Sequence, residues 1–168
     1  MTCSNVLPDP ALLNTLSKTT SGMTLLHVDD DVAFRRQVVE QIMTPLKFAR
    51  IDEAADGNTG WLKYSQRQYH LVITDFDLPG MVGTELIKRM HERNIQQNVI
   101  IMTRFDTIVS VKEMYRSSSK VQMISKTTVQ DCLSGKNIRP FWEAFARSCL
   151  FAKVSTMDPA GSGRTQPT

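Results

Sequence analysis

Acidic side chains, one threonine and one lysine follow directly after four short apolar segments of this chain. Three aspartates, residues 29–31, follow the segment MTLLHV, and Asp75 and Asp77 follow LVIT. Thr103 follows NVIIM, and Lys126 follows KVQMIS. Polar groups placed in this way at the ends of buried segments indicate a chemical site rather than a part of the core.

The aspartates are suited to holding a divalent cation. Carboxylates that lie close together resist ionising together, and a hard cation removes that cost. Magnesium prefers oxygen ligands in near-octahedral geometry and keeps several waters. Asp30 and Asp75 are the best carboxylate ligands, and the backbone carbonyl oxygen of Asp77 is a third. We therefore predict a Mg²⁺ site formed by two separate segments.

The same residues are suited to phosphoryl transfer. A carboxylate can attack phosphorus and form an aspartyl phosphate, and this chemistry requires mainly positioning and charge neutralisation from the protein. The metal can take one phosphoryl oxygen, the ammonium of Lys126 a second, and the hydroxyl of Thr103 can donate to a third. The pattern predicts Asp75 as the nucleophile.

Short apolar segments alternate with segments of helical periodicity along the chain, which predicts a parallel sheet built from βαβ units. The fold class is α/β, a flavodoxin-like doubly wound sheet of five parallel strands in the order 2-1-3-4-5, with five helices. Ligands bind beyond the carboxyl ends of the strands in such sheets, where the polar residues lie. The expected strands are 23–28, 47–54, 71–74, 98–102 and 120–125, and the expected helices include residues 34–43, 57–64, 86–90, 109–115 and 141–149.

Four parts of the chain resemble the receiver domains of two-component response regulators, over roughly residues 23–150. LLHVDDD resembles the end of the family's first strand, and LVITDFDLPGMVG, residues 71–83, resembles its phosphoacceptor segment. Residues 99–103 resemble the fourth strand with its switch threonine, and Ser125-Lys126 resembles the end of the fifth strand. The four parts occur in the family's order and at matching intervals.

The resemblance implies a single-domain response regulator that depends on Mg²⁺ and acts through protein contacts. Its phosphoryl donor would be a histidine kinase or a histidine phosphotransfer protein, and its output a downstream protein target. It would not be an enzyme, and at most would dephosphorylate itself slowly. The implied residues are the phosphoacceptor Asp75, the metal ligands Asp29, Asp30, Asp75 and Asp77, and the phosphate-sensing Thr103 and Lys126.

Three positions depart from the family's usual residues. Arg104 stands where a small residue usually follows the threonine, Met123 where an aromatic residue is usual, and Thr127 where proline is usual. In the family, Asp77 and Phe105 line the path of the attacking water. Together with Arg104 they are expected to tune access to the phosphoryl group.

Two alternatives follow from these departures and from the motif itself. One is a degenerate receiver that acts as a binding module without phosphorylation. The other is an aspartate-nucleophile phosphatase, because Asp75-Phe76-Asp77 also resembles the paired aspartates of haloacid-dehalogenase-type enzymes. Those enzymes carry the pair on their first strand, whereas here the cluster of residues 29–31 precedes it, and this order favours a receiver.

Composition separates the chain into three parts. The domain is expected at 23–152, with an N-terminal extension at 1–22 and a flexible C-terminal tail at 153–168. Both ends are rich in small and polar residues, so they are expected to bury little surface, apart from a short helix at 11–16.

Charge and cysteine content limit the possible partners and the compartment. The net charge of +3 is too small to favour nucleic acid, although the last third of the chain is locally basic, either as a solvated face or as a surface for an acidic partner. No apolar run is long enough to span a membrane. Three widely spaced cysteines favour reduced thiols in the cytoplasm.

Overall fold

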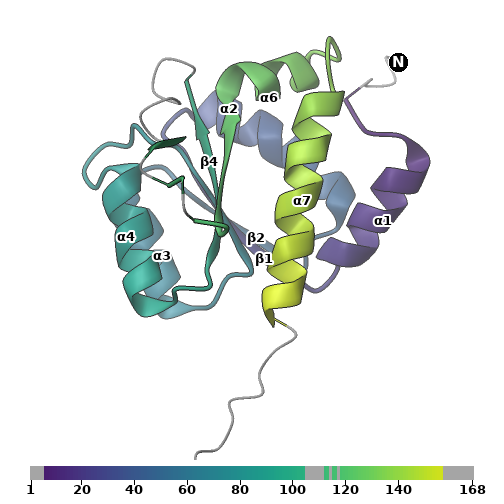
Figure 1. Ribbon diagram of the computed structural model, residues 1–168. Coiled ribbons are helices and arrows are strands. Elements are labelled where there is room, and N and C mark those ends of the chain that lie inside the picture. The colour runs from purple at the N-terminus through teal and green to yellow at the C-terminus, as the bar shows by residue number, and fades with distance from the viewer. Residues whose placement is uncertain (1–5, 105–111, 114, 117, 157–168) are drawn as a thin grey trace, which may run out of the picture.

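A five-stranded parallel sheet forms the centre of the molecule (Figure 1). The computed structural model describes residues 6–104, 112–113, 115–116 and 118–156 of the 168-residue chain. The strand order β2-β1-β3-β4-β5 confirms the predicted topology. The bounds differ from the expected ones by at most three residues: β1 is Thr24–Val28, β2 Arg50–Ala54, β3 Leu71–Thr74, β4 Asn98–Thr103 and β5 Val121–Ser125.

Six α-helices occur within the described residues, so the prediction of five helices is wrong. The sequence patterns missed α6, which begins directly after β5 because the hydroxyl of Ser125 accepts a hydrogen bond from the Thr128 amide at 3.0 Å. The helix expected at 109–115 lies largely outside the described residues. The helices are α1 (Pro10–Thr20), α2 (Val32–Val38), α3 (Gly57–Gln66), α4 (Gly83–Arg93), α6 (Lys126–Leu133) and α7 (Arg139–Thr156).

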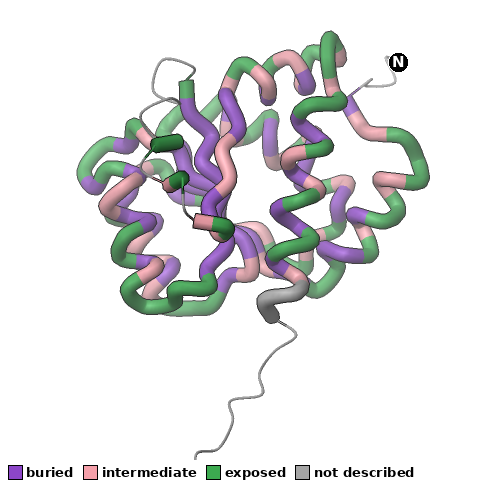
Figure 2. The backbone as a smooth tube through the Cα atoms, in the orientation of Figure 1, coloured by how far each residue is buried: buried purple, intermediate pink, exposed green. Residues whose placement is uncertain are grey.

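Helices cover both faces of the sheet, and each face has its own apolar cluster (Figure 1). Helices α3 and α4 cover one face, while α2, α7 and the N-terminal helix α1 lie on the other. Successive residues of β1 illustrate the alternation, because Leu25 belongs to the first cluster and Leu26 to the second. All four residues of β3 and all six of β4 are buried, as expected for strands covered on both faces (Figure 2).

The helix after β1 changes its hydrogen-bonding pattern before it ends. The α-helix α2 continues as the π-helix η1 (Val39–Met43) and the 3-10 helix η2 (Thr44–Leu46), which contains Pro45. Lys47 then adopts a left-handed backbone conformation with φ 58°. Pro45 thus lies at the end of the helical segment, because proline cannot continue the intrahelical bonds.

The segment before β1 packs against the domain, which corrects the expectation that it buries little surface. Helix α1 lies beside α7 and η2, and Leu16 is 1% exposed. The indole nitrogen of Trp142 donates a hydrogen bond of 2.8 Å to the carbonyl oxygen of Val6. The expected short helix is present and longer than predicted, since Asp9 caps its first turn. Composition alone gave the wrong answer because a few apolar residues on one helix face are enough for docking.

Within the described residues, no helix is both long enough and apolar enough to cross a lipid bilayer.

Candidate functional site

The carboxyl ends of β1 and β3 lie side by side and present the aspartates to one another. Val28 and Thr74 are register partners at the ends of these strands. The Asp75 amide donates to the Val28 carbonyl oxygen at 2.9 Å, and the Asp29 amide donates to the Ala54 carbonyl oxygen at 3.1 Å. Backbone pairing therefore fixes both aspartates at the point where the strands end.

Three of the predicted metal ligands form a compact carboxylate cluster. Oxygens of Asp29, Asp30 and Asp75 all lie within 4.8 Å of one another. Asp29 and Asp75 are buried, whereas Asp30 is exposed. Asp31 has a different role, because its carboxylate caps α2 by accepting a hydrogen bond of 2.9 Å from the Phe34 amide. The acidic run after β1 thus divides into two site residues and one helix cap.

Lys126 joins the two buried aspartates. Its Nζ lies 2.5 Å from Asp75 Oδ2 and 2.9 Å from Asp29 Oδ2. The ammonium also lies 4.9 Å from the centre of the Phe34 ring, a cation–π contact. Because the lysine side chain is only 15% exposed, it is a neutralising charge within the site rather than a solvated surface lysine.

Burial and pairing shift the pKa values of these groups in consistent directions. Burial raises the pKa of Asp29 to about 6, even though its hydrogen bond with Lys126 acts to lower it. Burial alone would lower the pKa of Lys126, but its hydrogen bonds to Asp75 and Asp29 outweigh that effect and raise it. The cluster therefore holds a permanent cation beside a carboxylate that is costly to ionise.

The loop after β3 is shaped by backbone contacts around Asp75. Asp75 Oδ1 accepts hydrogen bonds from the amides of Phe76, at 2.6 Å, and Asp77, at 3.3 Å. A side chain at Gly83 would bring its Cβ within 2.3 Å of the Asp75 carbonyl oxygen, and one at Gly57 within 1.9 Å of the Met81 carbonyl oxygen. These two glycines allow α3 and α4 to approach the loop closely.

Thr103 ends β4 directly opposite Ser125, the residue before Lys126. The threonine is fully buried, and its Oγ1 has no hydrogen-bond partner within the described part of the chain. An unpaired buried hydroxyl is costly unless it has another use. The lack of a partner leaves this donor available to a ligand.

Arg104 and Asp77 join the loops after β4 and β3. Arg104 Nη2 lies 3.7 Å from Asp77 Oδ2, and both side chains are largely exposed. The carboxylate of Asp77 is not in the cluster of three, so its predicted part in metal binding rests on its backbone carbonyl. Phe105, the third predicted tuning residue, lies outside the described residues.

The two other unusual positions lie on and beside β5. Met123 is half-buried and packs against the apolar cluster on the α3 and α4 face. It also lines a surface hollow of about 250 Å³ together with Lys112 and Thr128. Thr127 is the second residue of α6, so the segment that follows Lys126 continues as a helix.

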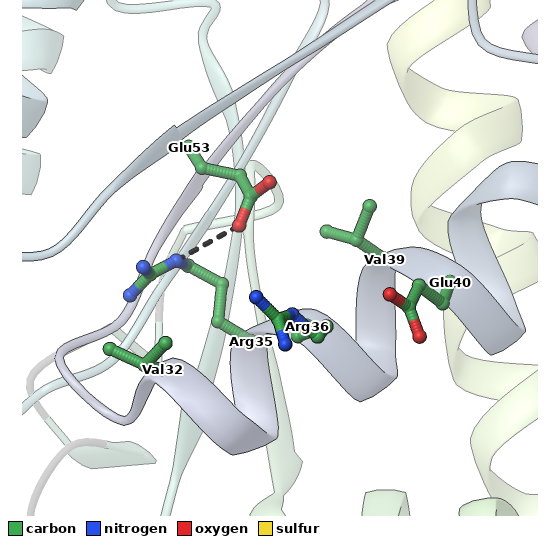
Figure 3. A pocket seen from close by; sticks show the side chains of 6 residues that line it. All are labelled: Val32, Arg35, Arg36, Val39, Glu40 and Glu53. Atoms are coloured by element: carbon green, nitrogen blue, oxygen red, sulfur yellow. Dashed lines mark hydrogen bonds and ion pairs between the residues drawn. The ribbon is translucent and has the colours of Figure 1, made fainter.

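Arg35 is a site residue that the sequence patterns missed. Its Nη1 donates to the Asp29 carbonyl oxygen, and its Nε pairs with Glu53 Oε2 at 3.0 Å. Figure 3 shows Arg35 extending from α2 to Glu53 on β2, at the edge of a hollow of about 190 Å³. The arginine thereby ties the β1–α2 loop to the edge strand. No sequence signal indicates this role, because the contact depends on the pairing of β1 with β2.

His27 lies beneath the site in the centre of β1. It is fully buried, and neither ring nitrogen has a hydrogen-bond partner within the described residues. Burial lowers the pKa of His27, and with the smaller contributions of the Arg35 and Lys126 charges it falls to about 3. The imidazole is therefore neutral at physiological pH, and it adds no charge to the site.

The donor set fits Mg²⁺, because three carboxylates from two loops provide hard oxygen ligands within one small volume. The response regulator receiver domain family matches residues 25–135. This match covers more than half of the chain, and the chain belongs to that family. Receiver domains are phosphoacceptor signalling domains that bind Mg²⁺ at an acidic pocket, and CheY-like receivers interact with histidine kinases and downstream targets.

Individual relatives agree with this membership. The chain is 35% identical over 69 residues to the chemotaxis protein CheY-3 of Vibrio cholerae, a match that covers 41% of this chain and 52% of that protein. The chain therefore spans about half the length of this curated relative. Among solved structures, a CheY-like receiver domain protein from Methanospirillum hungatei superposes with a TM-score of 0.63 at 22% identity, covering 80% of this chain and 98% of that one.

A second solved structure is the CheX-CheY-BeF3-Mg²⁺ complex from Borrelia burgdorferi. It superposes with a TM-score of 0.55 at 25% identity, covering 69% of this chain and 90% of that one.

Proposed function

We propose that this chain is a response regulator in which Asp75 accepts a phosphoryl group from a histidine kinase or a histidine phosphotransfer protein, in the presence of Mg²⁺. The supporting observation is the position of the Asp75 carboxylate. It lies within 4.8 Å of two further carboxylates and 2.5 Å from a lysine ammonium. A nucleophile, a cation site and a neutralising charge thus occupy one volume at the carboxyl ends of the strands.

The proposed transfer has a simple electron balance. A carboxylate oxygen of Asp75 forms the new bond to phosphorus while the bond from phosphorus to the donor's histidine nitrogen breaks. The electron pair of that broken bond stays on the ring nitrogen, which is the leaving group. Asp75 needs no general base, because a carboxylate oxygen attacks phosphorus without giving up a proton.

Each neighbouring group has a distinct part in this reaction. Bound at Asp29, Asp30 and Asp75, Mg²⁺ would neutralise charge on the phosphoryl oxygens. Lys126 would keep its position and exchange one carboxylate contact for a phosphoryl oxygen. Thr103 would donate its buried hydroxyl, which has no other partner within the described residues, to another oxygen. Because Thr103 ends β4, its movement would alter the loop that follows.

The direct test is a covalent mass change. We expect the protein, incubated with a small phosphodonor and Mg²⁺, to gain the mass of one phosphoryl group, and we expect Asp75→Ala or removal of Mg²⁺ to abolish the gain. Asp31→Asn is the matched control, because asparagine also caps helices and this acid lies outside the carboxylate cluster. Labelling of Asp75→Ala to the same extent would contradict the proposal.

The two alternatives give different results in the same experiment. A folded protein that gains no mass would be a binding module. Repeated turnover of a phosphate monoester would indicate the phosphatase. We propose at most slow self-dephosphorylation, because the Asp77 carboxylate is paired with Arg104 instead of facing the carboxylate cluster.

The output of the receiver is proposed to be a protein target. The Borrelia CheY in the solved complex is bound to CheX, which is consistent with signalling through protein contacts by a chain of this fold. We keep the division into an N-terminal segment, a receiver at 23–152 and a C-terminal tail as a prediction. Packing of α1 on α7 makes the N-terminal segment part of the folded body.

A further inference from the structure

We propose that Arg35 is a positioning residue for the Mg²⁺ site, and that its guanidinium raises the affinity for the metal by fixing the peptide group between Asp29 and Asp30. This inference rests on the Mg²⁺ site of the proposed function and assigns part of its affinity to a side chain outside the carboxylate cluster. It concerns how tightly the metal is held, whereas the proposed function concerns whether Asp75 accepts a phosphoryl group.

The guanidinium of Arg35 is held at two points. Its Nη1 donates to the Asp29 carbonyl oxygen, and its Nε donates to Glu53 Oε2 at 3.0 Å (Figure 3). Arg35 is the fourth residue of α2, and helical side chains lean toward the N-terminus of their helix, which here follows the loop that carries the aspartates. The arginine side chain is only 12% exposed, so two partners and the surrounding protein fix its planar group in one orientation.

The carbonyl group that Arg35 holds belongs to the peptide bond between two of the proposed metal ligands. A peptide group is planar, so the orientation of the Asp29 carbonyl sets the direction in which the chain enters Asp30. The Asp29 amide is held as well, because it donates to the Ala54 carbonyl oxygen at 3.1 Å. The end of the edge strand β2 therefore holds both backbone polar groups of Asp29, the amide directly and the carbonyl through Arg35.

Asp30 depends on this backbone contact more than Asp29 does. The Asp29 carboxylate is fixed separately, since it lies 2.9 Å from Lys126 Nζ and accepts a hydrogen bond of 3.0 Å from the Asp31 amide. Asp30 is exposed, and its carboxylate has no hydrogen bond or ion pair within the described part of the chain. Its position within 4.8 Å of the other two carboxylates is therefore set mainly by the peptide group that precedes it.

The charge and the position of Arg35 predict opposite effects on metal binding. A positive charge near a cation site repels Mg²⁺, so removing it would tighten binding if charge alone mattered. Loss of the hydrogen bond to the Asp29 carbonyl would release the peptide group and weaken binding, and groups that orient metal ligands typically change the affinity by about 10–100-fold. Because the carboxylate of Glu53 offsets the charge of the arginine, we expect the positional effect to be the larger one.

Calorimetric titrations of the full chain with Mg²⁺, without a phosphodonor, test the inference. Arg35→Met removes the guanidinium but keeps an apolar stem, and we expect the Kd for Mg²⁺ to rise about tenfold. Arg36→Met is the matched control, because Arg36 is the next residue of α2, is exposed, and forms no ion pair within the described residues. It should change the Kd by less than about twofold, since an exposed charge is screened by salt.

A conservative variant and a double-mutant cycle separate orientation from charge. Arg35→Lys should give an intermediate Kd, because an ammonium can donate to the Asp29 carbonyl but lacks the planar fork that binds two partners. Glu53→Ala should weaken Mg²⁺ binding when Arg35 is present and have no effect in the Arg35→Met background, whereas a charge effect of Glu53 would appear in both. Urea unfolding without metal is measured alongside, since a merely structural role of Arg35 would lower stability and leave the Kd of the folded protein unchanged.

Three results would count against the inference. Equal Kd values for Arg35→Met and Arg36→Met, or tighter binding in Arg35→Met, would overturn it alone. If Arg35→Met does not fold, Arg35→Lys and Arg36→Lys give the same comparison, and equal Kd values would again overturn it. Absence of Mg²⁺ binding by the unmutated protein would overturn this inference and the metal dependence of the proposed function together, while the gain of phosphoryl mass on Asp75 is measured independently.

Discussion

The acidic site and the contact between α1 and α7 lie in different regions of one domain and have opposite energetic character. At the site, Asp29 is fully buried although it carries a charge that burial disfavours. At the helix contact, Leu16 and Trp142 are as deeply buried but are apolar, and the one polar atom of the indole is hydrogen-bonded. Burial stabilises the second region and costs stability in the first, so the apolar packing must offset the site.

The largest expected effect is at the helix contact. Leu16→Ala should lower the free energy of unfolding by about 3 kcal/mol, because it removes apolar contacts and leaves a cavity. Urea unfolding followed by circular dichroism measures the change. Leu62→Ala is the matched control, since Leu62 is 55% exposed, and it should change stability by no more than about 0.5 kcal/mol. Equal effects in the two variants would contradict the docking of α1.

Removing the charge of Asp29 should increase the stability of the protein, whereas Leu16→Ala lowers it. Burial raises the pKa of Asp29 from 3.8 to about 6, so Asp29→Asn should increase stability at pH 8 without metal by about 2 kcal/mol. The same variant should bind Mg²⁺ more weakly, as measured by calorimetry. Asp30→Asn is the control, because Asp30 is exposed. It should weaken Mg²⁺ binding with little change in stability, and a stabilisation equal to that of Asp29→Asn would refute the burial argument.

The pH dependence of Mg²⁺ binding should show the same buried carboxyl. A protonated carboxyl cannot serve as a ligand, so affinity should fall by about tenfold per pH unit as the pH drops below about 6. In the absence of metal, the stability of the folded state changes with pH in the opposite direction to Mg²⁺ affinity. A raised carboxyl pKa favours the folded state at low pH, and that contribution is lost as pH rises through about 6. Calorimetric titrations between pH 8 and pH 5 test this, and an unchanged inflection in Asp29→Asn would assign it to another group.

The smallest expected effect concerns His27, a polar residue that is fully buried on β1. His27→Leu should increase stability by about 1 kcal/mol, because an imidazole that has no hydrogen-bond partner among the described residues is replaced by an apolar side chain. His70 is the contrasting position, since its Nδ1 accepts a hydrogen bond of 3.0 Å from the Thr24 amide. His70→Leu should therefore destabilise the protein. Urea unfolding measures both, and destabilisation by His27→Leu would show that the imidazole has a partner.

The fold was largely predictable because its signals are local. Buried strands such as β3 are continuous apolar runs, and the connecting helices have clear periodicity, so strand number, direction and order follow from general rules of βαβ units. Helix α6 was not predictable from its residues, KTTVQDCL, since two threonines and a valine are weak helix formers. The cap by Ser125 and packing of Val129 decide its conformation.

The candidate site was only partly predictable. Asp29, Asp30, Asp75 and Lys126 follow apolar strands, and adjacent parallel strands bring their carboxyl ends together. The residue types alone do not distinguish a ligand from a helix cap within the acidic run; the resemblance selected Asp29 and Asp30 as ligands, and the cap on α2 by Asp31 depends on the folded geometry. Contacts between side chains far apart in sequence depend on register and rotamer, which no local pattern encodes.

The sequence by itself determined where the strands lie along the chain and the residue types at their ends, because the strands depend on hydrophobic patterns that act over a few residues. The tertiary structure alone decided that Arg35 would tie the β1–α2 loop to Glu53, that Arg104 would meet Asp77, and that α1 would dock on α7. Those contacts join segments brought together only after the sheet has formed. Their energies depend on burial and distance, which are properties of the folded chain.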